Sequence, residues 1–257
     1  MYLSSHAQTH RGTVRQLNED AFLELPQQGV WVVADGMGGH AAGDVASQLV
    51  IDTIQQAVEY NPVDQISTEL LIQALQQSNA KLQQMSESQF AGNIVGSTVV
   101  VLWLKDDHYT LLWAGDSRGY LLRNHKLQQI TKDHSQVNDM VDEGVLKAEE
   151  AESHPLANVI TRAVGVDDTL NIDVKSAPIL VGDVFLLCSD GLNKEVSDNE
   201  IEKALQPGNI IDAGMALMHA SLVRNARDNV TCILVKNNSL ESNKTINNND
   251  ATIPVFT

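Results

Sequence analysis

The sequence is poor in cysteine, in positive charge and in long apolar runs, and each shortage excludes a class of protein. The two cysteines, Cys188 and Cys232, lie inside apolar stretches, so we expect buried thiols and neither a disulfide framework nor a zinc site. No apolar run approaches membrane-spanning length, and the first residues lack the basic and apolar regions of a secretory signal. We therefore expect a soluble, cytoplasmic protein.

Positive charge is the second shortage. The chain carries 17 Lys and Arg against 33 Asp and Glu, a formal net charge of −16. This excess repels nucleic acid backbones and anionic lipid surfaces, so neither is expected as a partner. A bound divalent cation would reverse the field of a carboxylate-lined cleft. The composition is therefore compatible with a metal site.

The pattern of apolar residues predicts more strands than helices. Strands are expected at 30–34, 97–104, 109–114, 119–123, 184–188 and 229–236, and amphipathic helices at 42–58 and 71–85. Because the two types do not alternate one for one, an α+β fold with antiparallel sheets fits better than a parallel sheet. A chain of 257 residues with this composition is expected to form one domain.

Two polar segments stand outside this pattern. Residues 133–156 are acidic and only weakly periodic, which indicates short helical pieces or a flap over a site. Residues 237–257 are rich in Asn, Ser and Thr with few large apolar residues, so we expect a disordered tail.

Four aspartates adjoin the predicted strands, and they are the candidates for chemistry. Asp35, Asp190 and Asp228 each lie next to an apolar strand, and Asp116 is a possible fourth. Strand ends can meet at one cleft, and carboxylates are ligands that Mg²⁺ and Mn²⁺ prefer. The carbonyl of Gly36 could add a ligand where strand 30–34 stops at an unusual turn. Asp-Gly after a strand is also a common turn signal, so the pattern alone leaves both interpretations open.

The order of short motifs resembles one known family. The motifs are Gly12-x-Val14-Arg15-x-x-Asn18-Glu19-Asp20, Val33-Ala34-Asp35-Gly36-Met37-Gly38-Gly39-His40, Gly96-Ser97-Thr98, Ala114-Gly115-Asp116-Ser117-Arg118, Asp133-His134-Ser135, Ile160-Thr161-Arg162-Ala163-Val164-Gly165, Gly182-Asp183, Ser189-Asp190-Gly191 and Arg227-Asp228-Asn229-Val230-Thr231. In these motifs the chain resembles the PPM, or type 2C, metal-dependent Ser/Thr protein phosphatases, in their compact bacterial branch. Each motif is weak alone, and their common order is specific.

The resemblance implies a fold and a metal centre. The fold would be a central sandwich of two antiparallel sheets with helices outside, a four-layer αββα domain over residues 1–236. Two Mn²⁺ or Mg²⁺ ions would be held at one end of the sandwich. Asp35 would bridge them, the carbonyl of Gly36 would bind one, and Asp190 and Asp228 would bind the other. Asp116, together with Asp190, would hold a weaker third ion.

The same resemblance implies roles for residues around the metals. Arg15 would bind the substrate phosphate, for which the fork of a guanidinium is well suited. Glu19 and Asp20 would hold metal-bound waters, and Asn229 would orient Asp228. In isolation, an Asn-Glu-Asp run is more often a capping or solvated segment.

The implied reaction is hydrolysis of phosphoserine and phosphothreonine in proteins by direct attack of a metal-activated water. Met37 stands where eukaryotic relatives have a histidine proposed as general acid, and a thioether cannot donate that proton. We assign no such role to His40, His134 or His154. The expected partners are phosphoprotein substrates and an opposing Ser/Thr protein kinase. The alternatives are a catalytically weak binding or regulatory protein of the same fold, and a hydrolase of small phosphoesters or nucleotides.

Overall fold

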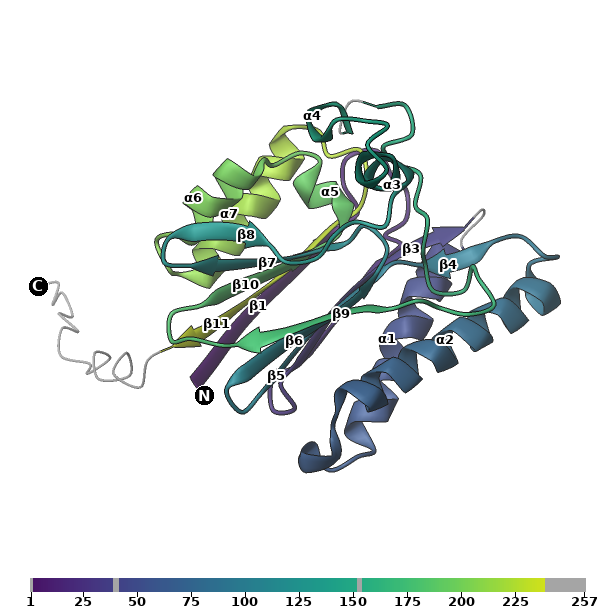
Figure 1. Ribbon diagram of the computed structural model, residues 1–257, viewed down its shortest axis with the longest axis horizontal. Coiled ribbons are helices and arrows are strands. Elements are labelled where there is room, and N and C mark those ends of the chain that lie inside the picture. The colour runs from purple at the N-terminus through teal and green to yellow at the C-terminus, as the bar shows by residue number, and fades with distance from the viewer. Residues whose placement is uncertain (1, 39–41, 152–153, 239–257) are drawn as a thin grey trace, which may run out of the picture.

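Figure 1 shows the computed structural model, which describes residues 2–38, 42–151 and 154–238. Two antiparallel sheets face each other, and helices cover both outer surfaces, which confirms the α+β sandwich with four αββα layers. The first sheet has the order β1-β11-β10-β7-β8, and the second has the order β2-β3-β5-β6-β9, with β4 paired to β3. Neighbouring strands in both sheets run antiparallel.

The strands, in chain order, are β1 (Tyr2–His10), β2 (Asp20–Leu25), β3 (Val30–Gly38), β4 (Val95–Ser97), β5 (Val99–Lys105), β6 (His108–Ala114), β7 (Arg118–Arg123), β8 (Lys126–Gln129), β9 (Asp173–Pro178), β10 (Val184–Cys188) and β11 (Val230–Asn238). The helices are α1 (Gly43–Glu59), α2 (Thr68–Gln89), α3 (Gln136–Asp142), α4 (Ala148–Ala151), α5 (Asp190–Asn193), α6 (Asp198–Leu205) and α7 (Ile210–Val223), with a short 3₁₀ helix η1 at Val63–Gln65.

The central strands are apolar throughout because both of their faces are buried. In β3, Val30 and Val32 pack in the cluster under α1 and α2, whereas Trp31 and Val33 belong to the core between the two sheets. Strands β10 and β11 alternate in the same way between the inter-sheet core and the cluster under α6 and α7. Side chains of a strand point to opposite faces in turn, so a strand between two apolar layers has no polar face.

The two predicted long helices are confirmed as α1 and α2, and side-chain caps mark the starts of α2 and α6. Helix α2 begins three residues before the predicted start, because the hydroxyl of Ser67 accepts a hydrogen bond from the backbone N–H of Leu70. At α6, the carboxylate of Glu200 accepts from the backbone N–H of Ser197 at 3.1 Å, as in a capping box. Across the described residues, no helix combines the length and the apolar character that crossing a membrane requires.

The predicted end of the strand at Asp35 is wrong, because β3 continues to Gly38. Beyond Asp35 the strand pairs with β4, where Gly36 lies opposite Ser97. A Cβ on Gly36 would come within 1.8 Å of the carbonyl oxygen of Gly43, so this position needs glycine for a close backbone approach rather than for a turn. The predicted strand 97–104 is also broken at Thr98, between β4 and β5. There the backbone N–H and the hydroxyl of Thr98 form hydrogen bonds with the backbone of Asp35.

Of the two polar segments, residues 133–156 can be compared with the structure almost completely, and the predicted tail at 237–257 only at its first two residues. Residues 133–156 contain α3 and α4, the short helical pieces expected there. Strand β11 runs to Asn238, two residues past its predicted end, and the rest of the predicted tail, from 239 onward, lies outside the described residues.

The two cysteines are free and buried, as expected. Cys188 and Cys232 are directly opposite each other in the β10–β11 ladder. Burial raises the pKa of Cys232 to about 12 and raises that of Cys188 as well, so neither thiol ionises at neutral pH.

Candidate functional site

The four predicted aspartates meet at one end of the sandwich, and Asp20 joins them. Asp35 is the centre of the group: burial raises its pKa well above the ordinary value, and neighbouring negative charges raise it further. Those neighbours are the carboxylates of Asp20, Asp190, Asp116 and Asp228. Residues far apart in the sequence therefore form one carboxylate cluster.

The backbone of Asp35 is held by hydrogen bonds with Ser97 and Thr98, at the junction of β4 and β5. Its N–H donates to the hydroxyl of Thr98 at 3.2 Å, and its carbonyl accepts from the N–H of Thr98 at 2.8 Å and from the hydroxyl of Ser97 at 3.1 Å. Asp20 lies directly opposite Asp35 in the β2–β3 ladder, so the two side chains share one face. The sheet register thus fixes where the Asp35 carboxylate points.

Only one of the two carboxylate oxygens of Asp20 is hydrogen-bonded. Its Oδ2 accepts hydrogen bonds of 2.7 Å from the hydroxyls of Ser189 and Thr231, while its Oδ1 is buried without a hydrogen-bond partner. Burial raises the pKa of Asp20 to about 7, against the lowering effect of the two hydroxyls. Ser189 precedes Asp190 directly, so this carboxylate also ties β2 to the start of α5.

Asp190 and Asp116 form the deeper side of the site. Asp190 is the first residue of α5, and Asp116 lies in the loop between β6 and β7. Both residues are nine-tenths buried, and in both the Oδ1 oxygen lacks a hydrogen-bond partner. Burial and the charge of Asp190 raise the pKa of Asp116 to about 7, and Lys194 acts against them. The Oδ2 of Asp190 contacts the ammonium of Lys194.

Asp228 and Arg15 form the outer, solvent-facing side. Oδ2 of Asp228 accepts from Nη2 of Arg15 at 2.8 Å, and its Oδ1 accepts from the backbone N–H of Asn229 at 2.9 Å. The Arg15 side chain is 48% exposed, which leaves part of its guanidinium open to a ligand. Nη1 of Arg15 also lies 4.0 Å from Oε2 of Glu19. Arg15 is thus a cation at the mouth of an acidic site.

Glu19 lies between the site and the start of α1. Its carbonyl accepts from the N–H of Gly36 at 3.0 Å, and its carboxylate packs so closely on Gly43 that a Cβ there would lie 2.4 Å from Oε1. Burial raises the pKa of Glu19, while the charge of Arg15 and a hydrogen bond from the Gly43 backbone act against that rise. The residue joins β2, β3 and α1 at the edge of the carboxylate cluster.

The side chain of Asn229 holds the loop that carries Arg15. Its Oδ1 accepts from the N–H of Glu19 at 2.7 Å, and its Nδ2 donates to the carbonyls of Arg11 and Leu17 at 3.0 and 2.9 Å. Only the backbone N–H of Asn229 reaches Asp228. Asn229 therefore acts on Asp228 through its main chain and on the Arg15 loop through its amide.

The donor set fits a hard divalent cation. The cluster offers carboxylate oxygens without thiolate or imidazole, and three of them, Oδ1 of Asp20, Asp116 and Asp190, are buried without a hydrogen-bond partner. Buried, unpaired carboxylates that repel one another are stabilised by a cation. Among the described residues, no three His, Cys, Asp or Glu side chains already stand as a closed ligand set. Two of the carboxylates instead engage Lys194 and Arg15.

The ring nitrogens of His134 and His154 are engaged by neighbouring groups rather than by the carboxylate cluster. His134 is 6% exposed; its Nδ1 accepts from the N–H of Gly115 at 3.1 Å, and its Nε2 lies 3.3 Å from the carboxylate of Asp173. Nδ1 of His154 accepts from the N–H of Leu156 at 3.2 Å. His40 lies outside the described residues.

Lys194 is the main residue of the site that the sequence analysis missed. It lies four residues after Asp190, and that spacing on a helix places an acid beside a base. The spacing was therefore a usable signal. The roles of three hydroxyls were missed as well: those of Ser189 and Thr231 donate to the Asp20 carboxylate, and that of Thr98 accepts from the Asp35 backbone N–H. These contacts arise when distant segments pack together and have no pattern in the sequence.

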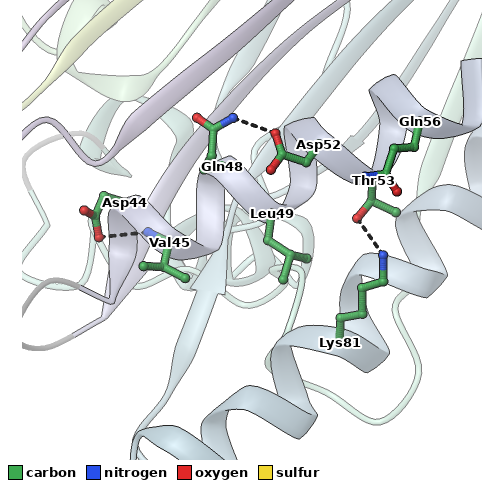
Figure 2. A pocket seen from close by; sticks show the side chains of 8 residues that line it. All are labelled: Asp44, Val45, Gln48, Leu49, Asp52, Thr53, Gln56 and Lys81. Carbon is green, nitrogen blue, oxygen red and sulfur yellow. Dashed lines mark hydrogen bonds between the residues drawn. The ribbon is translucent and has the colours of Figure 1, made fainter. Parts of the chain in front are cut away.

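A separate surface depression of about 610 Å³ lies between α1 and α2, and Figure 2 shows the side chains that line it. Its polar groups pair with each other: Gln48 donates to Asp52 at 2.7 Å, and Lys81 donates to the hydroxyl of Thr53 at 3.3 Å. The lining lacks the convergent, unpartnered carboxylates that mark the aspartate cluster, so the cluster is the candidate active site.

Comparisons with known proteins agree over most of the chain. The family model described as Protein phosphatase 2C matches residues 7–228. The chain is 35% identical over 237 residues to the Serine/threonine phosphatase stp of Listeria monocytogenes, covering 89% of this chain and 93% of that protein. The structure of PppA, described as a key regulatory component of T6SS in Pseudomonas aeruginosa, is similar with 41% identity and a TM-score of 0.82, covering 92% and 98% of the two chains. The catalytic domain of the serine threonine protein phosphatase PstP, in complex with 2 manganese ions, is similar with 35% identity and a TM-score of 0.81, covering 91% and 97%.

Proposed function

The chain belongs to the protein phosphatase 2C family, and we propose that it is a metal-dependent hydrolase of phosphoserine and phosphothreonine in proteins. The observation that carries this proposal is the meeting of Asp35, Asp190 and Asp228, from three distant segments, beside the half-exposed guanidinium of Arg15. Carboxylates for cations next to a fork of donors for phosphate are the parts that phosphoryl hydrolysis needs.

Four residues would hold two Mn²⁺ or Mg²⁺ ions. Asp35, at the centre of the cluster, is proposed as the bridging ligand, with the carbonyl of Gly36, Asp190 and Asp228 completing the set. Asp116 is proposed as a ligand of a weaker third ion. When bound, the ions supply Lewis acidity that activates a water for attack on phosphorus and neutralise charge on the phosphoryl group.

The remaining residues position substrate and ligands. Arg15 would bind two phosphoryl oxygens through its guanidinium, which requires it to loosen its contact with Asp228. Asn229 would keep the Arg15 loop in place, and Glu19 and Asp20 would orient water near the metals. Met37 packs against Gly96 and carries no proton to donate, so protonation of the leaving serine or threonine needs another source.

The first test is hydrolysis of a phosphothreonine peptide. We expect turnover with Mn²⁺, its loss in EDTA, and its loss in Asp190→Ala. Asp168→Ala removes an exposed aspartate at 168 and serves as the matched control. Turnover that survives EDTA or Asp190→Ala would overturn the proposal.

Two other functions make different predictions. A binding or regulatory protein of this fold would be folded and metal-replete yet inactive on every phosphopeptide tested; the intact aspartates and Arg15 argue against it. A hydrolase of small phosphoesters or nucleotides would show a higher kcat/KM on nucleotides than on phosphopeptides. We further propose that a Ser/Thr protein kinase supplies the substrates, which phosphoproteomics with and without the active enzyme would test. A cytoplasmic location stays a prediction from the sequence.

A further inference from the structure

Lys194 places its positive charge beside Asp190 and Asp116, two of the proposed metal ligands. Its backbone N–H donates to the carbonyl of Asp190 at 2.9 Å, and its ammonium contacts Oδ2 of the same residue. The Asp190 side chain is 12% exposed, whereas that of Lys194 is 39% exposed. The long lysine stem therefore comes from the surface and carries its charge toward a buried carboxylate.

The two carboxylates beside Lys194 are only partly satisfied by hydrogen bonds. Oδ1 of Asp190 and Oδ1 of Asp116 have no hydrogen-bond partner, and both residues are nine-tenths buried. Both line a cavity of about 380 Å³ together with Asn193 and Lys194. Arg118, another cation at this cavity, is engaged by Asp133 through hydrogen bonds of 2.8 to 3.0 Å.

We propose that the ammonium of Lys194 is a built-in counter-cation for the Asp190–Asp116 pair and competes with a divalent ion for these two carboxylates. This inference rests on the proposed function, in which both aspartates are metal ligands. An ion at Asp190 and Asp116 must displace the ammonium, and the exposed stem of Lys194 lets it turn out to solvent. The ion held by Asp190 and Asp116 is then bound weakly because the protein already holds a cation at its site.

The test is calorimetric titration of Mn²⁺ into the full chain after removal of metals with EDTA. We compare the wild type with Lys194→Met and Lys194→Gln, which remove the charge, and with Lys194→Arg, which keeps it. Lys203→Met removes an exposed lysine on α6 and is the control for net charge. Thermal unfolding in EDTA checks that each variant is folded.

The two neutral variants should bind one more Mn²⁺ per chain, or bind their weakest ion about tenfold or more tightly, the effect expected from removing one partly exposed unit charge. Lys194→Arg and Lys203→Met should match the wild type. Neutral variants whose isotherms match that of Lys203→Met would overturn the inference while leaving the proposed function intact. A wild type that binds no Mn²⁺ would overturn both.

Discussion

The side-chain carbonyl of Asn229 lies 2.7 Å from the backbone nitrogen of Glu19, a hydrogen bond between residues 210 positions apart. Two further bonds from the same amide reach the carbonyls of Arg11 and Leu17. Since Asn229 is buried and adjoins Asp228, it fixes the loop that carries Arg15 relative to a metal-ligand candidate. One amide therefore helps to set the position of Arg15, the proposed phosphate ligand, relative to Asp228, a proposed metal ligand.

Asn229→Ala should destabilise the protein and weaken substrate binding. The change leaves three main-chain groups without their partner, which is expected to cost about 1–3 kcal/mol of unfolding free energy. Displacement of Arg15 should raise KM for a phosphopeptide. Urea unfolding and steady-state kinetics measure the two effects. Asn61→Ala, which removes one hydrogen bond to the carbonyl of Ala57 at the end of α1, is the control, and equal losses in both variants would contradict this role.

The metal-free protein should lose stability as pH rises from about 4 toward 8, because buried carboxylates must then ionise. Burial raises the pKa values of Asp20 and Asp116 to about 7, so the folded state binds more protons than the unfolded state in this window. The free energy of unfolding then falls with increasing pH. Urea unfolding in EDTA at pH 5 to 8 should show a smaller fall in Asp116→Asn than in the wild type. Mn²⁺ should stabilise the wild type most at high pH; identical pH profiles for the two proteins in EDTA would refute the prediction.

The ion pair between Arg118 and Asp133 should contribute far more to the free energy of unfolding than an exposed ion pair does. The two side chains are 18% and 12% exposed and share hydrogen bonds of 2.8 to 3.0 Å. Arg118→Met leaves the buried Asp133 carboxylate without its charged partner and with the amide of Gln129 as a remaining donor, with an expected loss of about 3–5 kcal/mol in unfolding free energy. The control is Arg224→Met, whose partner Glu200 lies at the surface, and it should change stability little. Chemical denaturation compares the two, and similar losses would show that burial does not decide the effect.

His134 should make the fold sensitive to acid. Its ring stacks on Trp113 with centroids 6.2 Å apart and an angle of 11° between the planes. Burial lowers the pKa of His134, so the unfolded state takes up a proton more readily as pH falls below about 6.5. That uptake lowers stability in acid. His134→Gln should reduce the loss between pH 7 and 5, measured by tryptophan fluorescence during urea unfolding; the exposed His125→Gln is the control, and an unchanged acid loss would contradict the prediction.

Rising pH should lower stability through the buried carboxylates, whereas falling pH should lower it through His134. Each contribution is therefore measured as a difference between the wild type and one variant. The comparison with Asp116→Asn isolates the carboxylate contribution, and the comparison with His134→Gln isolates the imidazole contribution. Both residues belong to the same end of the sandwich, where the N–H of Gly115, the residue before Asp116, donates to His134.

Local patterns predicted the central strands and the two long helices, since a helix or strand buried on known faces repeats its apolar residues at a fixed period, whereas strands β1, β2, β8 and β9 and helix α7 were not predicted. Helix α1 and strand β10 lie where the sequence placed them, and Ser67 and Ser197 mark helix starts through local capping. The path of β3 through Asp35 was not predictable in this way. It depends on pairing with Ser97 and on contact with Gly43, and neither contact is local.

The sequence by itself determined the family, through the order of short motifs, and with it the expected layers of the fold and the aspartates proposed as metal ligands. The tertiary structure alone decided how the carboxylates are held. Asp20 faces Asp35 through the sheet register, Asn229 reaches across 210 positions to Glu19, and the Lys194 ammonium is aimed at Asp190 beside Asp116. Such relations arise when separate segments pack together, and the free energy of a buried charge depends on the neighbours that this packing supplies.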